Sequence, residues 1–75
     1  MGKRLDDIQL ARQLSELQAY AAEVFGDRDA ALGWLDTALS ELDDLSAREI
    51  VTRTGARGLE RARDVLLRIE YGVYR

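Results

Sequence analysis

The sequence predicts an all-α fold, a small bundle of about four helices in which the N- and C-terminal helices are long and two short helices lie between them. Two apolar stripes with alternating steps of three and four residues predict the long helices. The lack of proline and of any strand-like alternation favours the same class. A chain of 75 residues has room for one domain, expected at residues 5–75 after a disordered lead-in at residues 1–4.

The first long helix is expected from Leu5 to Phe25, with Gly26 ending it in the C′ position. Its buried stripe is predicted to be Leu10, Leu14, Leu17, Ala21 and Val24. The stripe is too short for a long coiled coil, so we expect it to face the other long helix inside the bundle.

The last long helix is expected from Gly55 to Tyr71, with Thr52 or Thr54 as its N-cap and Gly72 as its stop. Its stripe is predicted to be Leu59, Ala62, Leu66, Ile69 and Val73.

Capping residues mark two short helices between the long ones. Asp27 is the expected N-cap of the first, which carries Trp34 as a core residue whose indole N–H reaches a carbonyl. Ser46 and Glu49 have the spacing of a capping box, which predicts a further helix as far as Val51. Residues 36–45 between them predict a loop or a single helical turn held by leucines.

The charge distribution is uneven along the chain. Residues 1–46 carry four basic and ten acidic side chains, whereas residues 47–75 carry seven arginines and four acidic side chains. An acidic N-terminal part and a basic C-terminal part can serve intramolecular neutralisation, self-association or the binding of an acidic partner. No apolar run approaches the roughly 20 residues of a membrane span and no signal-peptide pattern is visible, so we expect a soluble, cytoplasmic protein.

The composition argues against an enzyme. The chain has no histidine and no cysteine, so the commonest general base, the best nucleophile and the Cys/His zinc ligands are all missing. Adjacent pairs such as Asp6-Asp7 do not share a helix face and make a poor catalytic dyad. A calcium loop that starts at Asp27 would need an oxygen ligand at Ala31 and a glycine at Leu32. We therefore expect no catalytic residue, no metal and no cofactor.

A nucleic-acid-binding alternative rests on arginines near the last helix. Arg53, Arg57 and Arg61 follow at steps of four and would line one helix face, next to a GxxG sequence that starts at Gly55. The acidic net charge of −3 argues against phosphate binding as the main role of the domain, so nucleic acid is an unlikely partner.

The C-terminal end is the favoured interaction site. Tyr71, Tyr74 and Arg75 lie at or beyond the expected helix stop, and tyrosine and arginine often carry binding energy at protein interfaces. We expect Tyr71 and Tyr74 at an interface rather than in the core, whereas Tyr20 in the first long helix is expected to be structural.

A set of short motifs, in their order and approximate spacing, resembles the Xre/MbcA/ParS toxin-binding domain of bacterial antitoxins. The resemblance extends from about Leu10 to Tyr74. Its motifs are Val24-Phe25-Gly26-Asp27, Ala31-Leu32-Gly33-Trp34-Leu35, Gly55-Ala56-Arg57 and Arg68-Ile69-Glu70-Tyr71-Gly72-Val73.

The resemblance implies a noncatalytic antitoxin domain whose partner is a RES-domain toxin, an enzyme that consumes NAD or transfers ADP-ribose. It also implies that the C-terminal end of the antitoxin reaches the toxin's active-site cleft and obstructs it. The partner-binding residues carried over, with the end of the chain that follows them, are Arg68, Glu70, Tyr71, Gly72, Val73, Tyr74 and Arg75. A homo-oligomer is a further expectation, because a small core without disulfides often completes itself by association.

Some positions depart from the family's pattern. Ala38 and Ala47 stand where proline is common and Asp44 where glycine is common, and about one extra helical turn separates Gly55 from Arg68. Such a turn would move the C-terminal end by roughly 5 Å and alter the toxin that it fits. No helix-turn-helix-like sequence precedes the motifs, so a stand-alone domain and a part of a longer protein both remain open. The extra turn keeps a helical dimerisation or adaptor module without a toxin as the alternative function.

Overall fold

The computed structural model describes the backbone of residues 2–72 and the side chains of residues 7–72. It confirms the all-α class, with a two-stranded sheet of two residues per strand as the exception. The elements in chain order are α1 (Gly2–Phe25), α2 (Arg28–Leu35), β1 (Ala38–Leu39), the 3-10 turn η1 (Ser40–Leu42), β2 (Leu45–Ser46), α3 (Ala47–Thr54) and α4 (Ala56–Glu70).

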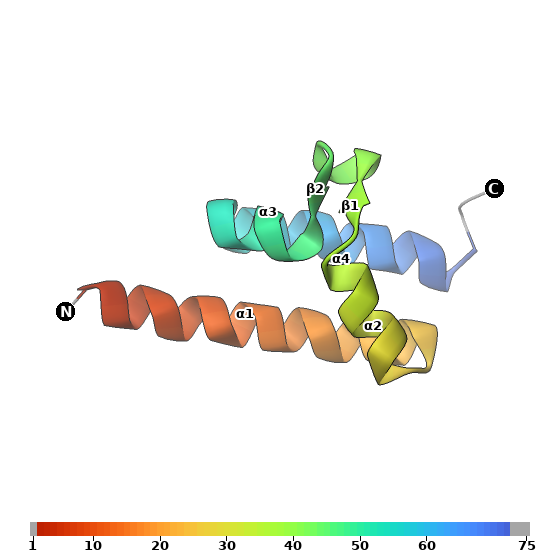
Figure 1. The fold of residues 1–75 in the computed structure, drawn as a ribbon, viewed down its shortest axis with the longest axis horizontal. Coiled ribbons are helices and arrows are strands. Elements are labelled where there is room, and N and C mark those ends of the chain that lie inside the picture. Colours follow the sequence, from red (N-terminus) through yellow and green to blue (C-terminus); the bar gives the residue numbers. More distant parts are fainter. Residues whose placement is uncertain (1, 73–75) are drawn as a thin grey trace.

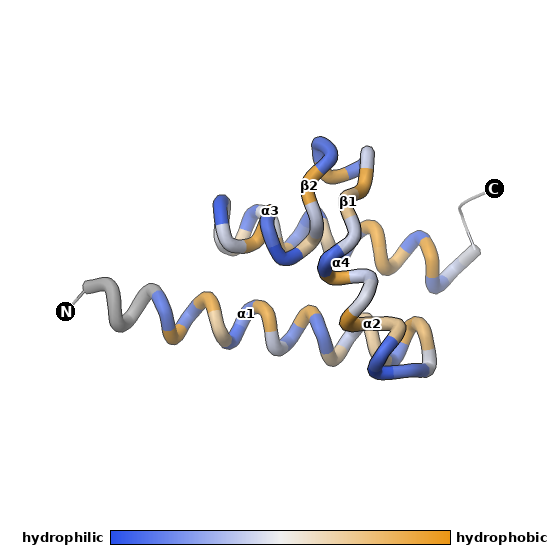
Figure 2. The backbone as a smooth tube through the Cα atoms, in the orientation of Figure 1, coloured by the Kyte–Doolittle hydropathy of each residue, from blue (hydrophilic) through white to orange (hydrophobic). Residues whose placement is uncertain are grey.

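The two long helices, α1 and α4, pack against each other as their apolar stripes predict and run in the same direction (Figure 1). The short helix α2 folds back on α1, and α3 reverses into α4 at Gly55. Apolar positions recur along both long helices with hydrophilic positions between them (Figure 2). Buried side chains from all four helices belong to one cluster, so the bundle has one shared interior.

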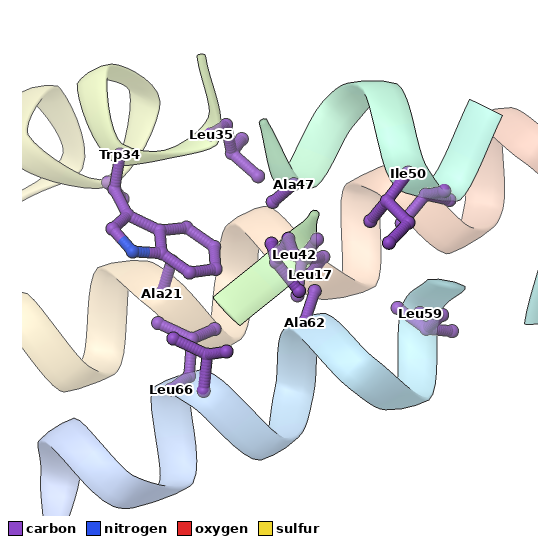
Figure 3. Close-up of a cluster of buried hydrophobic side chains, with 13 residues drawn as sticks. Leu17, Ala21, Trp34, Leu35, Leu42, Ala47, Ile50, Leu59, Ala62 and Leu66 are labelled. Atoms are coloured by element: carbon purple, nitrogen blue, oxygen red, sulfur yellow. The ribbon is translucent and has the colours of Figure 1, made fainter. Parts of the chain in front are cut away.

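The core contains the centre of both predicted stripes (Figure 3). Leu17 and Ala21 of α1 are fully buried, as are Ala62 and Leu66 of α4. The remaining buried apolar side chains are Ala31, Trp34, Leu35, Leu42, Ala47, Ile50, Val51, Leu59 and Val65. Val73, the last member of the predicted α4 stripe, lies outside the described residues.

The first helix differs from its prediction only at its start. It begins at Gly2 instead of Leu5, so it enters the stretch expected as a lead-in. It ends at Phe25 as predicted, where Gly26 has a φ of +70° and its N–H donates to the Ala22 carbonyl over 2.8 Å. A left-handed φ of this kind costs glycine little, which is why the helix ends there.

The predicted side-chain caps of α2 and α3 are both present. Asp27 accepts a hydrogen bond from the Ala30 N–H at 3.0 Å and starts α2. Ser46 accepts from the Glu49 N–H at 3.1 Å, while the Glu49 carboxylate accepts from the Ser46 N–H at 3.0 Å. These reciprocal bonds form the capping box that starts α3, which continues to Thr54 instead of ending at Val51.

The segment between α2 and α3 contains the predicted single helical turn, held by the fully buried Leu42. The sequence did not predict the short antiparallel pairing around it, which joins Ala38 to Ser46 and Leu39 to Leu45. Two residues per strand are too few to show an alternating pattern. Asp43 and Asp44 turn the chain with φ of 60° and 64°, a conformation that aspartate tolerates better than most residues and glycine adopts freely.

The predicted cap of α4 is wrong. Gly55 is the N-cap and has no side chain that could cap the helix, and the hydroxyls of Thr52 and Thr54 make other hydrogen bonds. They donate to the carbonyls of Arg48 at 2.7 Å and Ile50 at 2.6 Å, one turn earlier in α3. Threonines inside a helix readily make this bond, and the positive φ of 65° at Gly55 then reverses the chain.

Trp34 is in the core as predicted, but its indole N–H does not reach a carbonyl. Its side chain packs beside Phe25 with ring centroids 6.2 Å apart, and only 9% of the residue is exposed. Among the described residues the buried Nε1 has no hydrogen-bond partner. The burial of the large ring outweighs the unpaired donor.

Candidate partner-binding surface

The last turn of α4 carries the chain out of the core. Ile69 remains partly buried, whereas Tyr71, the residue that caps the helix, is 73% exposed. Gly72 then adopts a φ of +66° and its N–H donates to the Ile69 carbonyl over 3.2 Å. The helix thus stops where the sequence predicted, and Tyr71 is an exposed residue and not a core residue.

The seven sequence-predicted partner-binding residues fall into two groups. Arg68, Glu70, Tyr71 and Gly72 lie together at the end of α4. Val73, Tyr74 and Arg75 lie outside the described residues, so their placement and roles stay predictions.

Two of the described residues have partners within the chain. The Arg68 guanidinium forms an ion pair with Asp64 one turn earlier at 3.0 Å, with both side chains about half exposed. Exposed pairs of this kind contribute only a few tenths of a kcal/mol, so Arg68 remains available to another carboxylate. The Glu70 carboxylate accepts a hydrogen bond from the Tyr20 hydroxyl at 2.9 Å, which ties the end of α4 to α1.

Tyr20 is therefore part of this surface, although the sequence suggested only a structural residue. The contact spans 50 positions of the chain and no short-range pattern indicates it. Partial burial, followed by the hydrogen bond to Glu70 and the charge of that carboxylate, raises the pKa of the Tyr20 phenol above its ordinary value of 10.0.

The raised pKa predicts a late-titrating phenol and a pH-dependent stability. The contact contributes fully below the unfolded pKa of about 10 and is lost as the pH rises through the higher folded pKa. Tyrosinate absorbance against pH should show one phenol that titrates late, and Tyr20→Phe should remove that component. A titration in which Tyr20→Phe removes an early component would contradict the contact.

A shallow hollow of about 550 Å³ lies beside the Tyr20–Glu70 contact. Leu67 forms part of it and is 45% exposed, although the neighbouring Leu66 is completely buried. The one signal in the sequence was that Leu67 falls outside the three-four stripe of α4. The hollow is lined by Tyr20, Glu60, Arg61, Arg63, Asp64 and Leu67.

The arginine face expected for nucleic acid is not formed as predicted. Arg53 belongs to α3, whereas Arg57 and Arg61 belong to α4. Arg61 pairs with Asp43 at 2.9 Å and donates to the Glu41 carbonyl at 3.0 Å, so it holds the turn after η1 against α4. The three arginines therefore do not form one phosphate-binding stripe.

The described part of the chain contains neither a candidate metal site nor a candidate membrane-spanning helix. No group of three or more acidic side chains there could hold a metal ion. None of the helices within residues 2–72 combines the length and the apolarity needed to cross a bilayer.

An exposed aromatic, an exposed leucine and charged side chains thus lie together towards the end of α4 in a small helical domain. Residues 21–72 match the family described as the antitoxin Xre/MbcA/ParS C-terminal toxin-binding domain. This match covers well over half of the chain, and the chain belongs to that family. Comparison with curated proteins and with solved structures gave no significant match. The domain is thus of the antitoxin type, and its partner is a toxin.

Proposed function

We propose that the domain binds and neutralises a RES-domain toxin, one that consumes NAD or transfers ADP-ribose, by placing its C-terminal end at the toxin's active site. The observation that carries this proposal is the exposed Tyr71 at the end of a helix whose preceding turns are fixed in the core. An aromatic on a rigid support loses little conformational entropy on binding, which favours affinity.

The partner-binding residues in this proposal are Arg68, Glu70, Tyr71 and Gly72, followed by Val73, Tyr74 and Arg75. Glu70 is oriented by Tyr20, and Gly72 has the left-handed φ at which the helix stops. The role is obstruction and not catalysis, since the chain contains neither histidine nor cysteine. The expected homo-oligomer and the cytoplasmic location stay predictions.

The test is to add the purified chain to a purified RES-domain toxin and to measure the loss of NAD. We expect inhibition that saturates at a fixed molar ratio, because obstruction of an active site needs one bound chain for each site. An unrelated NAD-consuming enzyme without a RES domain is the control and should be unaffected. Undiminished loss of NAD with excess chain would show that RES toxins are not its target.

A further inference from the structure

Two hollows meet on the side of the bundle where α1 lies against α4. Tyr20 of α1 and Arg63 of α4 line both of them. The first has a volume of about 550 Å³ and the second about 360 Å³. The name acidic hollow denotes the part of their combined lining formed by Glu16, Tyr20, Glu23, Glu60, Arg63 and Leu67.

The acidic hollow is continuous with the end of α4. Leu67 and Tyr71 are four residues apart and therefore lie on the same face of the helix. They are two of the three large apolar side chains that are exposed within residues 7–72. Tyr20 connects the hollow to the same end through its bond to Glu70. A partner that contacts Tyr71 is thereby brought alongside Leu67 and Tyr20.

The charged side chains around Tyr20 and Leu67 do not balance one another. Within residues 7–72, the carboxylates of Glu16, Glu23 and Glu60 take part in no hydrogen bond and no ion pair. The other charged residues of the first hollow's lining are already paired, Asp64 with Arg68 and Arg61 with Asp43. Arg63 is the one lining cation left without a carboxylate in the described residues. Negative charge therefore predominates around Tyr20 and Leu67.

We propose that the acidic hollow receives an arginine- or lysine-bearing segment of the toxin, next to the site where Tyr71 binds. The aliphatic part of such a side chain packs on Leu67 and Tyr20, and its charged group pairs with the unpaired carboxylates. This assignment rests on the proposed function, because the occupant is the same protein that the C-terminal end contacts. The interface then extends to the face of α4 that carries Leu67 and to the part of α1 that carries Tyr20. The toxin surface that contacts them is expected to be positively charged.

A pair of substitutions at one position tests the sign of that charge. Leu67→Lys and Leu67→Glu both remove the exposed apolar contact and both keep good helix formers. Lysine repels a cationic segment, whereas glutamate does not, so we expect Leu67→Lys to weaken toxin binding at least about tenfold more than Leu67→Glu. Calorimetric titration of the toxin at two salt concentrations should show the difference shrinking as salt is added.

A second test changes two carboxylates of the acidic hollow and leaves its apolar residues Leu67 and Tyr20 unaltered. The double variant Glu16→Gln, Glu23→Gln should bind the toxin about threefold to tenfold more weakly and with less salt dependence. Asp7→Asn is the matched control, because Asp7 is an exposed carboxylate of the same helix that lines neither hollow. Its affinity should equal that of the unaltered chain.

The outcomes separate this inference from the proposed function. If the unaltered chain binds and inhibits the toxin while Leu67→Lys and Leu67→Glu bind alike, the acidic hollow is not part of the interface. Weaker binding by Leu67→Glu than by Leu67→Lys, or unchanged binding by the double glutamine variant, would also overturn it. If the unaltered chain does not bind the toxin, the proposed function and the acidic hollow fail together.

Discussion

Gly58→Ala should destabilise the domain by about 3 kcal/mol, although alanine is the better helix former. A Cβ at position 58 would collide with the carbonyl oxygen of Ile50 and with the Thr54 hydroxyl, and would lie 2.7 Å from the Ile50 carbonyl carbon. The Ile50 carbonyl belongs to the backbone of α3 and already accepts the Thr54 hydroxyl, so it has little room to move. Relief of the overlap requires α3 and α4 to separate.

Gly33→Ala is the matched control for this prediction. Gly33 also lies inside a helix, but a Cβ there would meet nothing within 4 Å. The substitution should raise the free energy of unfolding by about 0.5–1 kcal/mol, the usual gain from glycine to alanine in a helix. Urea unfolding followed by circular dichroism measures both variants. A Gly58→Ala protein as stable as Gly33→Ala would contradict the close approach of α3 and α4.

Leu66→Ala should lower the free energy of unfolding by about 3 kcal/mol, because it leaves a cavity where α1 and α4 meet. Leu66 is fully buried in the cluster that contains Leu17 and Ala21 (Figure 3). A domain of 75 residues has only a few kcal/mol of stability in total, so this variant should be largely unfolded at physiological temperature.

Leu67→Ala provides the comparison, since Leu67 is the next residue and 45% exposed. It should cost about 1 kcal/mol or less, in proportion to the smaller apolar area it buries. Thermal unfolding of the two variants side by side distinguishes them. If both variants lose the same free energy of unfolding, α4 must be rotated about its axis relative to its orientation in the structure.

Features that depend on local spacing were predictable from the sequence. The two stripes gave the centre of the core correctly, with Leu17 and Leu66 at its middle, because a period of 3.6 residues places them on one helix face. Asp27 and Ser46 were identified as caps because their bonding partners lie three residues away. Gly72 was identified as a stop, since only glycine adopts its conformation without strain.

Features that depend on tertiary contacts were not predictable in the same way. The sequence predicts Arg61 in a phosphate-binding stripe, but its partner Asp43 is 18 positions away, in the turn after η1, and no spacing pattern indicates that the two side chains meet. The Thr54 hydroxyl had two acceptable uses, as a cap or as a donor to Ile50, and the sequence does not rank them.

The same limit applies to the candidate site. Tyr71 was predicted as an exposed interface residue because it lies at the helix stop, and the structure confirms its exposure. The sequence indicates only a structural role for Tyr20, because nothing near it in the sequence shows that its hydroxyl lies beside Glu70. The acidic hollow follows from that packing and not from any motif.

The most direct test of the central claim is the inhibition of a RES toxin by a chain that lacks residues 71–75. The deletion leaves the buried residues of α4 in place, so circular dichroism should be nearly unchanged. Deletion of residues 1–4 at the opposite end is the control and should not affect inhibition. The account predicts that removal of residues 71–75 raises the half-inhibitory concentration at least about thirtyfold, as expected from the loss of one interface hot spot of about 2 kcal/mol. Full inhibition by the shortened chain would contradict the account.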